Sequence, residues 1–117
     1  MSGNAEEAAA AVQRALLACV GPGAAEELAQ AQARLAWQET VAAAGLTGGG
    51  LSSRLLRVSN GVASIEASEP ILAQELTLRA DRLLTEVNRR MRGRPGATIE
   101  VNRLAISVGR GGQGRSL

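Results

Sequence analysis

Hydrophobic positions between residues 54 and 91 change period in a way that predicts a β-hairpin followed by a helix. Two short β-compatible runs, 54–59 and 62–67, flank the pair Asn60-Gly61, which tolerates the positive φ angles of a tight type I′ turn. Alternation within these runs predicts one buried face. Its members are Leu56, Val58, Ala63, Ile65 and Ala67.

After the hairpin, the apolar period becomes three and four residues, which predicts one amphipathic helix over 70–91. Its core stripe consists of Leu72, Leu76, Ala80, Leu83, Leu84, Val87 and Met91. On the opposite side, Ile71 and Leu78 lie seven residues apart, with Arg82 and Arg89 beside them. We expect this second stripe either to be covered by an N-terminal helix or to form a partner site edged with arginine.

Two further helices are predicted before the hairpin, over about 5–19 and 24–44. Gly21-Pro22-Gly23 separates them, because this tripeptide breaks any helix. The second helix carries apolar residues on two sides, and Trp37, the only aromatic residue of the chain, lies on one of them. A helix of this kind is expected to lie between two layers of structure or under a partner.

The C-terminal part predicts a third strand and a tail. The strand is expected at about 97–104 with Ile99 and Val101 inward, and an alternating pattern over 104–108 is compatible with its continuation past an irregularity. Residues 109–117 have no apolar period, which predicts a disordered Gly/Arg tail.

The element order ααββαβ predicts a single α+β domain over 1–108, in which helices pack against a three-stranded sheet. The helix, strand, strand, helix, strand portion is similar to the K-homology nucleic-acid-binding fold. True K-homology domains carry a G-x-x-G loop between two helices. Gly93-Arg-Pro-Gly96 has this spacing but leads into a strand, so the motif does not support standard K-homology RNA binding.

The chain's basic residues restrict the chemistry it can perform. All 13 are arginine; there is no lysine or histidine, and there is one cysteine. These absences exclude a P-loop, a Ser-His-Asp site, a Schiff base and a zinc site of the nitrogen and sulfur type. We therefore expect no enzyme, no cofactor and no bound metal.

Charge is divided unevenly along the chain. Residues 1–50 hold two arginines against five glutamates (net −3), and residues 51–117 hold eleven arginines against six acids (net +5). A solvated face explains such a bias most simply, but an arginine excess is also what a phosphate-binding surface needs. The nucleic-acid-binding candidates are Arg54, Arg57, Arg89, Arg90, Arg92, Arg94, Arg103, Arg110 and Arg115. With one aromatic residue to stack bases, binding is expected to depend on the phosphate backbone and on salt.

Targeting signals are not evident. Glu6 and Glu7 lie where a signal peptide would carry positive charge, and no apolar run approaches membrane-spanning length, so we expect a cytoplasmic protein.

Several short motifs resemble, in order and spacing, those of the DciA family of bacterial replicative-helicase loaders. The matching segments are Ala15-Leu-Leu, Trp37-Gln-Glu-Thr-Val, the hairpin at Asn60-Gly61, Ala73-Gln-Glu-Leu76 and Leu83-Leu-Thr-Glu-Val-Asn88. The resemblance extends from about residue 8 to residue 104.

This resemblance implies a non-enzymatic adaptor of DNA replication with a K-homology-like domain. Such a protein binds the DnaB-type replicative helicase and single-stranded DNA, helps to load the helicase, and associates with the nucleoid. The partner-binding candidates are Trp37, Ile71, Leu78 and Arg82. For Trp37 the sequence leaves two roles open, partner contact and packing in the core, and the core is the commoner place for a lone tryptophan. Two alternatives remain open: a stand-alone module that binds single-stranded DNA or RNA without a helicase partner, and a purely structural protein that forms a weak homodimer through the Ile71–Leu78 stripe.

Overall fold

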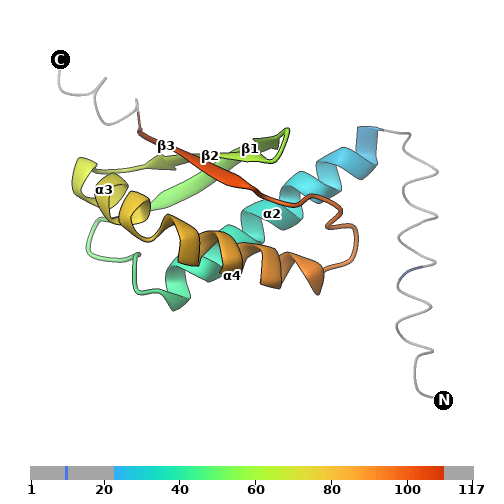
Figure 1. Cartoon of the computed structure of the whole chain (residues 1–117), viewed down its shortest axis with the longest axis horizontal. Helices are drawn as coiled ribbons and strands as arrows, with labels where there is room; N and C mark the ends of the chain where they lie inside the picture. Colours follow the sequence, from blue (N-terminus) through green and yellow to red (C-terminus); the bar gives the residue numbers. More distant parts are fainter. Residues whose placement is uncertain (1–9, 11–22, 110–117) are drawn as a thin grey trace.

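The computed structural model describes Ala10 and residues 23–109, and the predicted first helix and Gly/Arg tail lie almost entirely outside these residues. The described helices and strands longer than one residue are α2 (Gly23–Ala43), β1 (Ser53–Ser59), β2 (Val62–Ala67), α3 (Pro70–Leu78), α4 (Ala80–Arg92) and β3 (Arg103–Val108). The three helices lie on one side of a three-stranded sheet (Figure 1). The predicted α+β class is therefore confirmed.

The sheet has the order β1-β2-β3 and is mixed, since β2 pairs antiparallel with β1 and parallel with β3. Positive φ angles at Asn60 (52°) and Gly61 (78°) form the predicted tight hairpin turn. Of the predicted inward residues, Val58, Ala63, Ile65 and Ala67 are buried.

The prediction for Leu56 was wrong. A register shift between Leu55 and Arg57 marks a β-bulge, whose extra residue inverts the alternation of side chains along β1. Leu55 consequently faces the core, whereas Leu56 is 38% exposed. A strict two-residue period cannot reveal a bulge of this kind.

The predicted bounds of the third strand were also wrong, because β3 begins at Arg103. Val101 is buried as expected, but its backbone bonds to a side chain of α4. Asn88 donates from Nδ2 to the Val101 carbonyl (2.8 Å) and accepts at Oδ1 from the Val101 N–H (2.9 Å). Asn88 thus holds the segment before β3 against the helix layer.

The single helix predicted over 70–91 is divided into α3 and α4 at Arg79 (φ −104°, ψ 13°). No proline or glycine lies near the break. The Thr77 hydroxyl donates to the Ala73 carbonyl at 2.8 Å, a contact that often bends helices. The two halves also pack in different places, α3 against β2 and β3 and α4 mainly against α2, so the chain direction changes between them.

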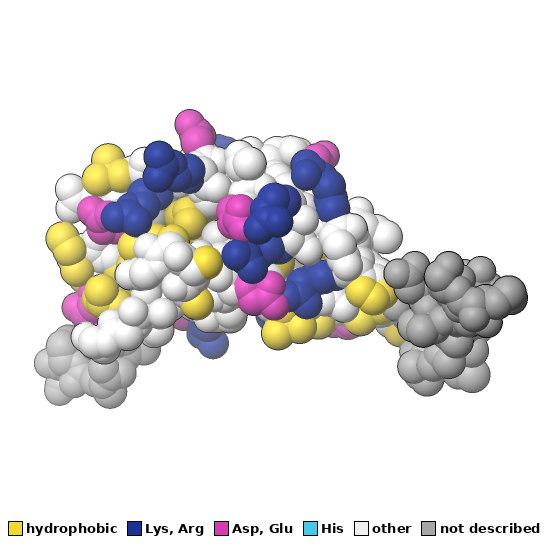
Figure 2. Space-filling model, turned by 90° about the horizontal axis from the view of Figure 1, so that it is seen from below, with side chains coloured by type: hydrophobic (Ala, Val, Ile, Leu, Met, Phe, Trp, Pro, Cys, Tyr) yellow, Lys and Arg dark blue, Asp and Glu magenta, His cyan; other side chains and the backbone are white. Residues whose placement is uncertain are grey.

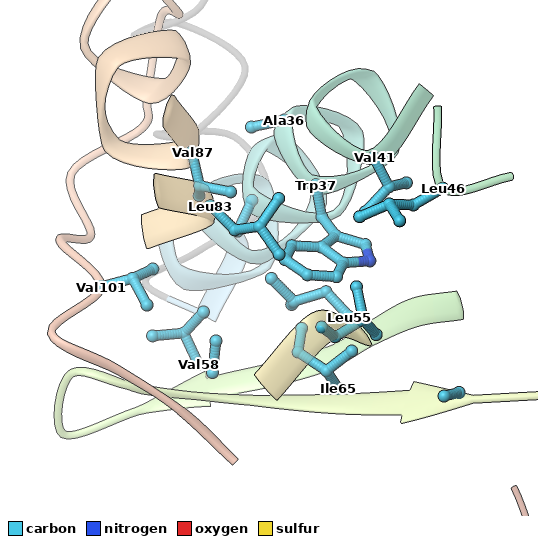
Figure 3. Close-up of a cluster of buried hydrophobic side chains, with 14 of the residues drawn as sticks. Ala36, Trp37, Val41, Leu46, Leu55, Val58, Ile65, Leu83, Val87 and Val101 are labelled. Atoms are coloured by element: carbon cyan, nitrogen blue, oxygen red, sulfur yellow. The ribbon is translucent and has the colours of Figure 1, made fainter. Parts of the chain in front are cut away.

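Trp37 lies at the centre of the core and is 0% exposed. Its ring extends from α2 toward Leu55 and Leu83 (Figure 3). The indole N–H donates to the Ser53 hydroxyl at 3.0 Å, so the polar atom of this large side chain is also satisfied. The other predicted apolar side of α2 is not covered by described residues, because Leu35 is exposed.

The outer edge of β1 is occupied by polar side chains of α2. These are Gln30, Arg34 and Gln38, one helical turn apart. In this order, they donate to the carbonyl oxygens of Val58 (2.8 Å), Leu56 (3.2 Å) and Ser53 (2.9 Å). The Val58 N–H also donates to the side-chain oxygen of Gln30 at 2.9 Å. Since an open edge invites pairing with another chain, this ladder protects β1.

No helix in the described part of the chain has the length and apolar character needed to cross a membrane.

Candidate partner and nucleic-acid interfaces

Two of the predicted nucleic-acid-binding arginines lie on β1, and each pairs with a carboxylate. Arg54 lies opposite Glu66 in the hairpin register and contacts its carboxylate at 2.9 Å. Arg57 pairs with Glu26 and so ties β1 to α2. Both pairs are exposed, and such pairs contribute little to stability. They do lower the positive charge that this side of the sheet presents.

Three more candidates surround two glutamates of the helix layer. Glu86 pairs with Arg89 and with Arg90 (2.9 Å), and Glu39 pairs with Arg90 (3.4 Å) and Arg94. Hydrogen bonding from Arg94 holds the pKa of Glu39 below its usual value. Arg89 likewise lowers the pKa of Glu86, which in turn raises the pKa of Arg89. The two carboxylates of this network thus offset most of the charge of its three guanidinium groups.

The view of the helix side from below is consistent with this local neutralisation. Basic side chains form separate groups, and acidic side chains lie between them (Figure 2). In addition, Arg89, Arg90 and Arg92 occupy the last turn of α4, where positive charge favours the negative end of the helix dipole. A structural role therefore accounts for much of the arginine excess.

Arg92 and Arg103 differ from the other described candidates. Both are exposed, and neither has a carboxylate within salt-bridge distance among residues 23–109. They flank the segment 93–102 that Asn88 anchors to α4. Arg110 and Arg115 lie outside the described residues. Among the described nucleic-acid-binding candidates, Arg92 and Arg103 are therefore the cations most available to a phosphate.

An open hollow of about 350 Å³ lies between the end of α2 and the start of α4. Its lining residues are Thr40, Ala43, Ala44, Arg79, Arg82, Leu83 and Glu86. Arg79 pairs with Glu75 at 3.1 Å, whereas no described carboxylate pairs with Arg82. The hollow therefore combines apolar side chains with two guanidinium groups and the Glu86 carboxylate, and arginine is one of the residues enriched in protein–protein interfaces.

The predicted partner-binding residues are distributed unevenly around this hollow. Arg82 lines it, and Leu78, which is 72% exposed, directly precedes Arg79 of the lining. Ile71 is 61% exposed at the start of α3, so the residues that the structure describes leave this part of the predicted stripe uncovered. The stripe does not continue along one helix, because the break at Arg79 separates Leu78 from Arg82.

Trp37 does not belong to either candidate surface. Its full burial and its bond to Ser53 leave no atom for a partner, so of the two roles that the sequence left open, the structure shows packing in the core and corrects the assignment as a contact residue. The sequence interpretation also omitted Arg79, Thr40 and the two alanines of the hollow. These residues come together because the helix breaks at Arg79, and no proline or glycine in the sequence marks that break.

Comparisons with known proteins add no assignment. No family model matches the chain, and no curated protein matches it significantly.

Proposed function

We propose that this chain is a non-enzymatic adaptor of bacterial DNA replication, which binds the DnaB-type replicative helicase and single-stranded DNA and helps to load the helicase. The observation that carries the proposal is the hollow between α2 and α4, with its apolar lining and its two arginines. The motifs that resemble the DciA family support the same conclusion, and two of them, Ala73-Gln-Glu-Leu76 and Leu83 to Asn88, lie on the helices on either side of Arg79.

We also propose that the domain is K-homology-like. The order helix, strand, strand, helix, helix, strand and the mixed sheet support this classification. In K-homology domains, a G-x-x-G loop between two helices holds the nucleic-acid backbone. The junction between α3 and α4 reads Leu78-Arg79-Ala80 and contains no glycine. Without these glycines, the junction lacks the loop by which K-homology domains hold a nucleic-acid backbone, so we assign it to the protein partner.

The expected helicase segment follows from the chemistry of the hollow. An apolar side chain would contact Ala43, Ala44 and Leu83, and an adjacent carboxylate would face Arg82. Arg82 is available because it has no carboxylate partner in the described part of the chain. The exposed side chain of Leu78 would extend the apolar contact.

Reversing the charge at Arg82 should therefore weaken helicase binding. We expect Arg82→Glu to lower the affinity for the helicase about 10- to 100-fold, because the new carboxylate would face the expected carboxylate of the helicase. A like-charge contact in an interface costs up to several kcal/mol, and about 1.4 kcal/mol corresponds to a tenfold change in affinity. The measurement is a titration of purified helicase without DNA. Arg103→Glu is the matched control, since it makes the same charge change at an exposed arginine on the sheet. Equal loss in both variants would contradict the assignment of the hollow.

DNA binding is proposed to depend on Arg92 and Arg103, together with the tail arginines. Each phosphate contact contributes about 0.7 to the salt dependence of single-strand binding, so Arg92→Gln with Arg103→Gln should lower the slope of log K against log salt by about 1.4. The control is Arg54→Gln with Arg89→Gln, which removes two arginines that pair with carboxylates. An unchanged slope in the first variant would exclude this site. DNA binding without any helicase binding would favour the stand-alone module.

A further inference from the structure

The second edge of the sheet, formed by β3, is open among the described residues. Arg103 donates its N–H to Gly61 and Gly109 donates to Ala67, so the odd-numbered residues of β3 face β2. Because backbone groups alternate in direction along a strand, the N–H and C=O groups of residues 104, 106 and 108 point away from the sheet. No hydrogen bond to these groups comes from residues 23–109.

This edge lacks the protection that β1 has. The outer edge of β1 receives the side chains of Gln30, Arg34 and Gln38, whereas β3 has no comparable cover from the described helices. Between residues 104 and 108 there is also no charge, no proline and no register shift, which are the usual devices that block edge pairing. Among the described residues, side chains therefore cover the β1 edge of the sheet and leave the β3 edge open to pairing.

The sequence of the edge is self-complementary when β3 meets a second β3 antiparallel about a twofold axis at Ile106. Ile106 then faces Ile106 of the other copy, and Leu104 faces Val108, so every pair on the core side is apolar. On the other side of the sheet, Ala105 faces Ser107, and both side chains are small. No like charges oppose one another, which is the condition for favourable cross-strand pairs.

We propose that two copies of this chain associate through their β3 edges to form a continuous six-stranded sheet. Leu104 and Ile106 are half-buried at the rim of the core, so pairing would remove their remaining apolar surface from water. The main-chain groups of residues 104, 106 and 108 would supply the hydrogen bonds, as in recognition by strand addition. This inference is independent of the proposed function, and it uses a surface other than the Ile71–Leu78 stripe.

Paired charge variants test the proposal directly. Ala105→Lys with Ser107→Lys sets a lysine opposite a lysine twice in the dimer, at positions on the open side of the sheet. We expect sedimentation to show a concentration-dependent dimer for the wild type and a monomer for this variant. Ala105→Glu with Ser107→Glu should also be monomeric. An equimolar mixture of the two variants should restore the dimer, because lysine then faces glutamate.

Three controls make the result decisive. Ser52→Lys with Ser59→Lys adds the same charge at exposed positions beside or within β1 and should dimerise like the wild type. Leu78→Ser should also dimerise, whereas loss of its dimer would assign the contact to the α3 stripe. Circular dichroism of each variant verifies the fold. A wild type that stays monomeric at all concentrations, or a mixture that fails to associate, would overturn the proposal, and neither result bears on helicase binding.

Discussion

Replacing Trp37 with alanine is expected to lower the free energy of unfolding by about 3–5 kcal/mol, as for other large buried aromatic residues. The ring is fully buried, and it contributes the largest side chain of a core otherwise made of aliphatic residues. The change would also remove the donor to the Ser53 hydroxyl, which is itself buried. Domains of this size are stable by about 5–15 kcal/mol, so the loss is a large fraction of the total.

Urea unfolding followed by far-ultraviolet circular dichroism is the appropriate measurement, since Trp37→Ala removes the only tryptophan fluorophore. Trp37→Phe is the control. It keeps an aromatic ring but lacks the indole N–H, and it should cost less than half as much as the alanine change. Similar stability of the wild type and the alanine variant would mean that Trp37 is not a core residue. If the expected loss is found, a binding measurement on Trp37→Ala is interpreted only where circular dichroism shows that the variant is folded.

Replacing Gln30 with leucine is expected to lower the free energy of unfolding by about 2–4 kcal/mol, although it adds apolar surface. The side chain is 1% exposed and satisfies both the N–H and the C=O of Val58. Each buried backbone group left without a partner costs about 1–3 kcal/mol. The change would also open the edge of β1, so we expect the variant to aggregate more readily.

Gln38→Leu is the matched control, because it makes the same change on the same helix toward the same strand. Gln38 is more exposed and makes one hydrogen bond, to the Ser53 carbonyl, so its loss should cost about 1 kcal/mol or less. Urea midpoints compare stability, and light scattering after mild heating compares aggregation. Equal effects in the two variants would show that the Val58 contacts contribute no special stability.

Much of the fold is predictable from the sequence because local signals agree. The Asn60-Gly61 turn and the three- and four-residue apolar period identify the hairpin and the helices. The errors arise where tertiary contacts override local pattern. The bulge at Leu55 and Arg57 inverts Leu56, and Asn88 keeps Val101 out of the sheet. No proline or glycine marks the break at Arg79. It lies where α3, which packs on β2 and β3, gives way to α4, which packs mainly on α2.

The candidate surfaces are less predictable than the fold. Counting arginines suggests a broad basic face, but the structure places a glutamate beside five of the candidates: Glu26, Glu39, Glu66 and Glu86. Of the described candidates, Arg92 and Arg103 alone have no carboxylate partner among residues 23–109. Pairing across the fold cannot be read from composition. One signal was readable and missed: polar residues one turn apart on α2, which close the β1 edge.

The central claim, that this chain is a helicase adaptor, is tested most directly by titrating the wild-type chain with the purified DnaB-type helicase of the same organism at low salt, without DNA. We predict a saturable complex that Arg82→Glu weakens at least tenfold and that Arg103→Glu leaves intact. Absence of any complex with the wild-type chain, when circular dichroism verifies that it is folded, would contradict the account.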